Sequence, residues 1–402
     1  IGDVAIEAPG LTCTGELLTE DFLNLSTTNG FILVNAPVTT LNNLTLSADN
    51  TGSSEAAIGF GLLGALTSTF GDVSLHGVGD DGIGVSLTTP VEDTTIITAT
   101  AVVGSIDISG VGSKGIELGN FELLASNASV ILNGTATDGT TGNRIGVDIS
   151  ACMIQSPELM ILGVGGNSNG TGNLGVLFDY ALPLATISEL TISGTGGSGS
   201  TGCHGVELRS FNAPTLSSLQ VTGDSQSAFD SHGVYLSTTS DITAATTIIT
   251  GVTARTTSSS GVLIHSPITG NFLEISITGS AIDAVESKGT HVSGLITAST
   301  GPISIVGNCN GGDACIGTHI SRAITASGNG FISIDGSSLI DTNYSIGILL
   351  EEDLMAAGNR ELTINGTSSG STGESTGVSI QSSSIFISGS GNLNIMGVSA
   401  NT

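Results

Sequence analysis

The chain of 402 residues has no Trp, and aromatic residues make up only 3 % of it. Charged residues make up 10 %, whereas a typical globular chain has roughly 25 %. Hydrophobic residues still make up 39 % of the chain, dominated by Ile, Leu and Val, and this is too apolar for a disordered protein. The sequence therefore predicts a folded protein whose core is built from aliphatic rather than aromatic side chains.

Basic residues are equally scarce, with 7 Lys and Arg against 35 Asp and Glu, for a net charge of -28. Binding to nucleic acid needs clustered Lys and Arg that displace counterions, so we expect no nucleic-acid partner. The same deficit argues against anionic membrane surfaces. No apolar run approaches the ~20 residues of a membrane-spanning helix, so we expect no membrane insertion. Cations, or solubility at high salt, fit this acidity better.

A pattern of Gly, apolar, any residue, apolar recurs thirteen times, at spacings of 25 to 31 residues. The anchoring glycines are Gly30, Gly59, Gly84, Gly115, Gly146, Gly175, Gly205, Gly233, Gly261, Gly289, Gly317, Gly347 and Gly377. A second pattern, apolar-x-apolar-x-Gly, keeps phase with the first, as in "IDISG" ending at Gly110 and "ISIDG" ending at Gly336. A weaker apolar segment lies between them. The alternation has the period of a β-strand, so each repeat predicts three strands.

A period near 29 residues with three short strands is typical of a solenoid, in which successive turns of chain pair edge to edge. We predict an all-β parallel β-helix of about 13–14 coils, forming one continuous domain over 1–402 with an irregular first coil over 1–29. The glycines are expected to supply corner backbone angles that other residues avoid. Helix signals are nearly absent, and only "EEDLMAAG" (351–358) suggests one helical turn within a loop.

Two of the five cysteines, Cys309 and Cys315, lie in the Gly-rich stretch "GNCNGGDACIG". This stretch can bend to join them, so we expect a local disulfide. The alternative is a zinc site, which needs two more ligands nearby. Cys13, Cys152 and Cys203 are single, and we expect each to be buried as a small hydrophobic side chain.

The second residue after each anchoring glycine is expected to face outward and to stack on its equivalent in the next coil. This places Glu117 beside Asp148 at a spacing of ~5 Å. Two carboxylates so close repel, and a bridging calcium ion would relieve the repulsion. The alternative is two separately solvated carboxylates.

Histidines are stacked by the same register. His291 and His319 are neighbours in the outward column, where they are either surface imidazoles or two ligands of a shared transition metal. His204 and His232 form a second pair, in the column that precedes the glycine. The same two interpretations apply to that pair.

An enzyme of the β-helix type that cuts pectin-like polysaccharides is the less favoured alternative. The stretch "GVGDDGIGV" (77–85) is similar to the paired aspartates of polygalacturonases, which serve as general acid and base. That family's Gly-His-Gly and Arg-Ile-Lys segments do not occur in this sequence. Asp80 and Asp81 also lie in a variable loop, where a role in a turn or in loose cation binding is favoured. We therefore expect no enzyme and assign no catalytic or cofactor-binding residue.

The repeat unit "G-V-x-L … I-x-I-x-G" resembles the repeats of filamentous-haemagglutinin-like and adhesin-type bacterial surface proteins. The closest stretch is "LTISGTGGSGSTGCHGVEL" (190–208). The resemblance covers nearly the whole chain and implies a right-handed parallel β-helix that is secreted and displayed at the cell surface. It transfers no catalytic residue.

The ends of the chain do not read as caps. The sequence begins at Ile1 without a signal segment, and residues 393–402 stop in mid-repeat. Uncapped solenoid ends expose unpaired strand edges, and head-to-tail contact between copies generates a filament. We expect a segment of a longer chain or fibre: an extracellular structural protein that self-associates into a surface filament, sheath or stalk. The alternative is an adhesin that binds glycans or host surfaces through its outer loops.

Overall fold

The computed structural model describes residues 4–61, 64–88, 97–179, 186–226, 229–237, 241–254, 257–270, 272–311, 313–328, 330–339, 344–357, 361–370, 374–381, 383–388 and 390–401. The chain divides into two compact units, unit 1 (Ile1–Gly194) and unit 2 (Thr195–Thr402). Every regular element in the described ranges is a β-strand. Consistently, no helix there has the length and hydropathy needed to cross a membrane.

In unit 1 the chain passes repeatedly through three parallel sheets, which we call the long face, the glycine face and the short face. The long face contains β1 (Val4–Ala8), β4 (Leu23–Thr27), β7 (Leu44–Asn50), β10 (Val73–Gly79), β13 (Ile106–Gly112), β16 (Ser129–Ala136) and β19 (Glu158–Val164). The glycine face contains β2 (Leu11–Cys13), β5 (Ile32–Val34), β8 (Ile58–Phe60), β11 (Val85–Thr88), β14 (Lys114–Gly119), β17 (Ile145–Ser150) and β20 (Val176–Asp179). The short face contains β3 (Leu17–Thr19), β6 (Pro37–Thr40), β9 (Ala65–Ser68), β12 (Ile97–Ala101), β15 (Phe121–Leu124) and β18 (Met153–Gln155). Strand β21 (Glu189–Gly196) contains the boundary between the units.

Unit 2 repeats the same path. Its long face contains β23 (Asn212–Ser225), β25 (Asp241–Ala254), β28 (Glu274–Ile282), β31 (Ile303–Asn310), β34 (Ile332–Leu339), β37 (Leu362–Gly370) and β40 (Leu393–Asn401). Its glycine face contains β22 (Val206–Arg209), β24 (Val234–Leu236), β26 (Ser260–Ile264), β29 (Lys288–Val292), β32 (Cys315–Ile320), β35 (Tyr344–Leu350) and β38 (Glu374–Ile380). Its short face contains β27 (Ile268–Gly270), β30 (Ile296–Ala298), β33 (Ile324–Ala326), β36 (Leu354–Ala357) and β39 (Ile385–Ser388). In this unit the short face belongs to the same sheet as the long face, because the long strand β25 also pairs with β27 at Ile242 and Ile268.

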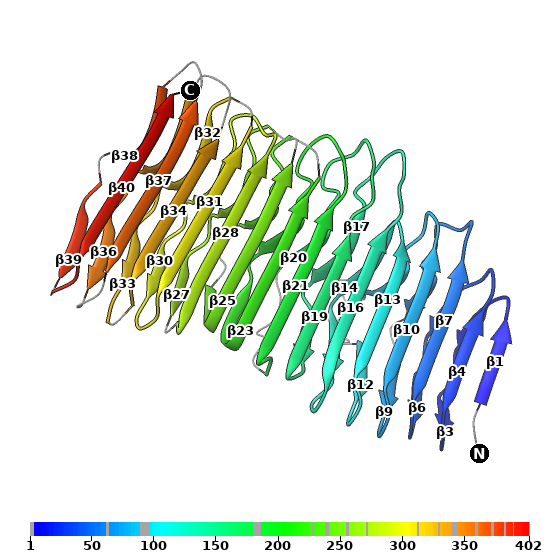
Figure 1. Ribbon diagram of the computed structural model, residues 1–402. Helices are drawn as coiled ribbons and strands as arrows, with labels where there is room; N and C mark the ends of the chain where they lie inside the picture. Colours follow the sequence, from blue (N-terminus) through cyan, green and yellow to red (C-terminus); the bar gives the residue numbers. More distant parts are fainter. Residues whose placement is uncertain are drawn as a thin grey trace. The chain divides into compact units, whose positions relative to one another are not determined.

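Equivalent residues of successive coils pair in parallel register, as the repeat predicts. In unit 1, Val85 pairs with Ile116, which in turn pairs with Val147. In unit 2, Val234 pairs with Val262. All five side chains are fully buried, so the first residue after each glycine forms an aliphatic ladder inside the stack. The predicted all-β solenoid with coils of about 29 residues is confirmed, and Figure 1 shows the long-face strands of each unit in chain order.

The anchoring glycines have a different role from the one expected. None of them has a positive φ, so they do not supply unusual corner angles. Instead the long face and the glycine face approach so closely that no side chain fits between them. A Cβ on Gly115 would lie 2.4 Å from the backbone nitrogen of Thr135 and 2.6 Å from the carbonyl oxygen of Gly146. A Cβ on Gly251 would lie 2.0 Å from the carbonyl oxygen of Gly261. The two glycine patterns of the sequence are thus the two sides of one tight backbone contact.

The helical turn expected within 351–358 does not form. Leu354–Ala357 is strand β36 of the short face, paired with β33 and β39. Leu354 and Ala356 point into the core and Met355 points outward. Good helix formers therefore occupy a strand because the neighbouring coils supply paired edges and a buried column.

Candidate functional site

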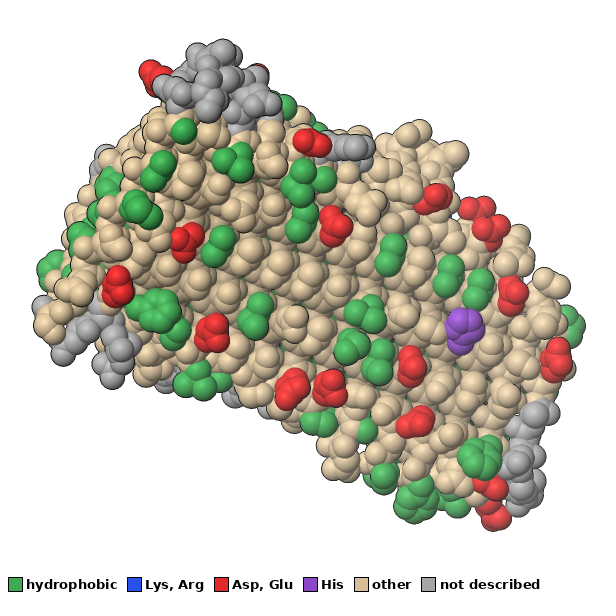
Figure 2. Space-filling model, in the orientation of Figure 1, with side chains coloured by type: hydrophobic (Ala, Val, Ile, Leu, Met, Phe, Trp, Pro, Cys, Tyr) green, Lys and Arg blue, Asp and Glu red, His purple; other side chains and the backbone are tan. Residues whose placement is uncertain are grey.

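Side chains with distinctive chemistry gather on the glycine face of unit 2. Five of the six histidines, all except His76, lie in its strands or directly beside them. Arg209 and Lys288 lie in strands β22 and β29 of the same face. The surface shown in Figure 2 contrasts with this: acidic side chains are scattered over it among small polar residues, and no Lys or Arg is in view. The glycine face of unit 2 is therefore the best candidate for a functional site.

His204 and His232 stack as the register predicts, with ring centroids 5.1 Å apart and an angle of 6° between the planes. The backbone N–H of His232 donates to Nδ1 of His204 at 3.0 Å. The backbone N–H of Ser260 donates to Nδ1 of His232 at the same distance. Because Nδ1 is an acceptor in both rings, the proton of each neutral imidazole is on Nε2. The pair therefore joins coils together and does not present two lone pairs to a shared metal.

Burial keeps both imidazoles neutral. Burial, with a smaller effect of the positive charge of Arg209, lowers the pKa of His204 to about 3. Burial also holds the pKa of His232 well below its usual value, and the neighbouring His204 and Lys288 lower it further. Both histidines are thus structural hydrogen-bond acceptors at neutral pH, and a role as a general acid is not supported.

The outward column of the glycine face is more buried than the sequence suggested. Glu207 is only 4 % exposed. Nε and Nη2 of Arg209 bind its two carboxylate oxygens at 2.6 Å and 3.0 Å. Tyr235, which pairs with Glu207 in register, contacts the rings of His204 and His232 with centroid distances of 5.2 Å and 5.3 Å. Neighbouring side chains therefore cover what we expected to be a solvent-facing column.

His291 and His319 also stack, with centroids 4.5 Å apart and an interplanar angle of 4°. Lone pairs of imidazole nitrogens lie in the ring plane, so two parallel stacked rings direct them side by side and not toward one ion. Each ring has its own partner: Nε2 of His291 lies 3.1 Å from Oγ of Ser321, and Nε2 of His319 lies 2.9 Å from Oε2 of Glu351. Burial and the neighbouring His319 lower the pKa of His291 to about 2. This geometry gives no support to a shared transition metal.

Glu117 and Asp148 in unit 1 are paired in register, as predicted. The positive charge between them is the ammonium group of Lys114, whose Nζ donates to Oε1 of Glu117 at 2.5 Å and to Oδ2 of Asp148 at 2.7 Å. Burial lowers the pKa of Lys114, but attraction and hydrogen bonds to Asp148 and Glu117 outweigh it, so this pKa is raised overall. The repulsion that a calcium ion would relieve is therefore already offset by Lys114.

No group of three or more His, Cys, Asp and Glu side chains among the described residues is arranged to hold a metal ion. Asp80 and Asp81 are both exposed in the turn between β10 and β11. The backbone oxygen of Asp80 accepts a 2.9 Å hydrogen bond from Oγ1 of Thr137, which fits the expected role in a turn.

Cys309 and Cys315 form the predicted disulfide, with their Cα atoms 5.8 Å apart, and this excludes the zinc alternative. The bond closes the turn between β31 and β32. In the two coils that follow, hydroxyls occupy the equivalent positions, and Oγ of Ser368 lies 2.6 Å from Oγ of Ser375. Of the other cysteines, Cys152 and Cys203 are buried as predicted, whereas Cys13 is half-buried.

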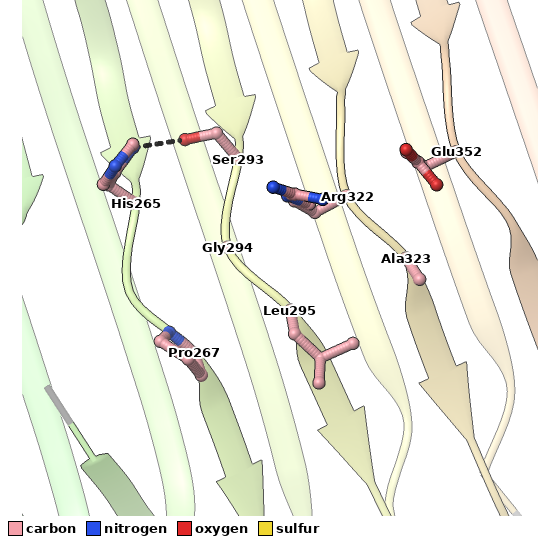
Figure 3. A pocket seen from close by; sticks show the side chains of 8 residues that line it. All are labelled: His265, Pro267, Ser293, Gly294, Leu295, Arg322, Ala323 and Glu352. Carbon is pink, nitrogen blue, oxygen red and sulfur yellow. Dashed lines mark hydrogen bonds between the residues drawn. The ribbon is translucent and has the colours of Figure 1, made fainter. Parts of the chain in front are cut away.

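Sequence reasoning missed a groove at the edge of the glycine face in unit 2, with a volume of about 440 Å³. His265, Ser293, Arg322 and Glu352 supply its polar groups (Figure 3). These residues follow strands β26, β29, β32 and β35, at positions that carry no repeated residue type. Only the register of the coils brings them together, so no local motif could have revealed the groove.

Comparison with protein-family models gives no match for this chain, and comparison with curated proteins gives none either.

Proposed function

We propose that this chain is a structural element of an extracellular filament, sheath or stalk, in which copies stack end to end through the edges of their solenoid sheets. The observation that supports the proposal lies in strand β40, at the open edge of the long face of unit 2. Leu393 and Ile395 of this strand are 49 % and 41 % exposed, although their register partners Leu362 and Ile364 are fully buried. A further parallel strand, from another copy or from more of the same chain, would bury both side chains.

The other edge has a matching surface. Ile6 of β1 is 41 % exposed, and its register partner Leu25 is buried. An edge of parallel strands with an exposed aliphatic column is complementary to another strand of the same pattern. Contact of β1 from one copy with β40 of another is heterologous, and repetition of such a contact builds a filament.

An extracellular location is supported by the Cys309–Cys315 bond, because disulfides persist in oxidising compartments. The resemblance of the repeats to bacterial surface proteins supports the same location. Adhesion is a second candidate function, and it is supported by the groove around Arg322, which offers polar groups to a ligand.

The test is to follow the length of the particles against protein concentration by electron microscopy and sedimentation velocity. The wild-type chain should form rods that lengthen with concentration. Ile395→Lys places a charge in the exposed aliphatic column and should keep the particles at the length of one copy. Asn394→Lys adds the same charge to the outward side of the same strand and should leave assembly intact. Compact monomers at every concentration of the wild type would overturn the proposal.

A further inference from the structure

The groove of unit 2 is built from four successive coils. It is lined by His265, Pro267, Ser293, Gly294, Leu295, Arg322, Ala323 and Glu352, and we call it the arginine groove. Its lining residues lie in the turns that lead from the glycine face to the short face. Because strands of neighbouring coils lie about 4.8 Å apart, three coil spacings give the groove a length of about 14 Å along the stack.

Gly294 forms the floor of the groove, and its lack of a side chain makes the groove deeper. A Cβ at this position would lie 2.2 Å from the backbone oxygen of Ser266 in the preceding coil. The turn at Gly294 therefore packs directly on the coil before it, and no side chain fills the space above. Leu295 follows and is 40 % exposed, so it offers an apolar surface to whatever occupies the groove.

Arg322 supplies the positive charge. Its side chain is exposed, and no described carboxylate lies within ion-pair distance of its guanidinium group. In Figure 3 the guanidinium extends across the groove toward Ser293 and Gly294, with Glu352 on the other side. Five N–H donors in a planar fork match a carboxylate in two-point contact.

Hydrogen-bond acceptors lie on both sides of the guanidinium group of Arg322. Oγ of Ser293 donates to the backbone oxygen of Ile264 at 3.1 Å and also lies 3.0 Å from Nδ1 of His265. Since the hydroxyl of Ser293 donates its proton to the oxygen of Ile264, it must accept from His265. The N–H of this ring is therefore on Nδ1. In the neutral ring Nε2 of His265 is then left as an acceptor. The carboxylate of Glu352 is a second acceptor, on the opposite side of Arg322.

We propose that the arginine groove binds a short saccharide that contains a uronic acid. Arg322 binds the sugar carboxylate, Nε2 of His265 and the carboxylate of Glu352 accept hydrogen bonds from sugar hydroxyls, and Leu295 contacts the apolar face of a ring. This goes beyond the structural role above, because stacking of coils needs no ligand. The net charge of -28 repels long polyanions. A short ligand is affected less, because charges farther away than about 8 Å are screened at physiological salt.

The test is calorimetric titration of the chain with trigalacturonate and, in parallel, with the neutral galactotriose. We expect binding of the acidic trisaccharide only, weakened by added salt. Arg322→Gln should reduce the affinity about tenfold or more, and Arg322→Lys should recover only part of it, because an ammonium group lacks the fork. Glu361→Gln removes an exposed carboxylate just before β37 and serves as a control with unchanged affinity. Both Arg322 variants should unfold at the wild-type midpoint.

Four results would overturn the assignment. The first is the absence of any heat of binding at millimolar trigalacturonate. The second is equal affinity for the neutral trisaccharide, which would remove the role of the carboxylate. The third is unchanged affinity in Arg322→Gln. A sulfated trisaccharide that bound more tightly than the uronate would also reject a uronic acid as the ligand. None of these results depends on whether the chain assembles, because titration of Ile395→Lys separates binding from filament formation.

Discussion

Nδ1 of His204 accepts a 3.0 Å hydrogen bond from the backbone N–H of His232, one coil further along the chain. His232 repeats the arrangement with the backbone N–H of Ser260. Two side chains thus act as acceptors for backbone donors of the next coil, while their rings stack. The bonds exist only while Nδ1 is unprotonated, so the joint between these coils is sensitive to acid.

Acid should destabilise unit 2 through this pair. The pKa of His204 in the folded chain, about 3, lies below its value of about 6.5 in the unfolded chain. For a lowered pKa the stability is complete above pH 6.5 and is lost as the pH falls from there toward the folded-state pKa. At pH 5 the titration of His204 should lower the free energy of unfolding by about 2 kcal/mol relative to pH 7.5, and His232 should lower it further. Urea unfolding at the two pH values measures this loss.

The double variant His204→Gln/His232→Gln is the control for the acid effect. A glutamine oxygen can accept the same backbone N–H, but it does not titrate. The variant should therefore keep most of its stability at pH 7.5 and lose less on acidification than the wild type. An equal loss in both proteins would place the acid sensitivity elsewhere.

Lys114 should be needed for the stability of unit 1. In Lys114→Met, Glu117 and Asp148 remain side by side without a counter-charge, and we expect a loss of about 1–3 kcal/mol at neutral pH, reduced by partial solvent exposure. The thermal midpoint should fall and should rise again when millimolar calcium is added. Calcium should not change the wild-type midpoint, and Lys114→Met/Asp148→Asn should recover without calcium. A wild type that is stabilised by calcium would show that an ion binds beside Lys114 after all.

Replacing both disulfide cysteines should preserve the fold. In Cys309→Ser/Cys315→Ser two hydroxyls occupy positions where Ser368 and Ser375 already hydrogen-bond in another coil. With a sequence separation of 6, the closed loop is short, and the expected loss is about 2 kcal/mol. Chemical denaturation with and without reductant measures it. The double variant should match the reduced wild type and should no longer respond to reductant.

Gly251 tests the tight contact between the long face and the glycine face. Gly251→Ala forces a Cβ to within 2.0 Å of the carbonyl oxygen of Gly261, and the backbones must separate. We expect a loss of at least about 3 kcal/mol, or insoluble protein. Gly15→Ala is the control, because no atom lies within 4 Å of its added Cβ. Equal stability of the two variants would mean that the two faces can move apart at little cost.

The period of the sequence was sufficient to predict the coils. Two patterns in phase identified the long face and the glycine face, and they placed Glu117 beside Asp148 and His291 beside His319. The disulfide followed from two cysteines close together in one turn. The stacked neighbours follow from the repeat, and the disulfide joins residues close in sequence. Contacts of both kinds can be predicted from a single sequence.

What could not be predicted depends on packing between faces. The close approach at Gly115 is a property of two sheets and not of one turn. The part played by Lys114 had a signal that was overlooked: it directly precedes an anchoring glycine, in the same column as His204 and His232. Arg322 and Glu352 had no signal, because they share a groove only after four coils have stacked.

The equal length of successive coils affects how the number of coils can change during evolution. From Gly205 to Gly317 the anchoring glycines are separated by 28 residues each, and each coil touches mainly the one before and the one after it. Gain or loss of one such segment by unequal recombination would shift the rest by one layer and leave every remaining contact type intact. The number of coils can therefore change by whole coils without loss of the fold. The groove tolerates no such change, because it needs four particular coils in their present order.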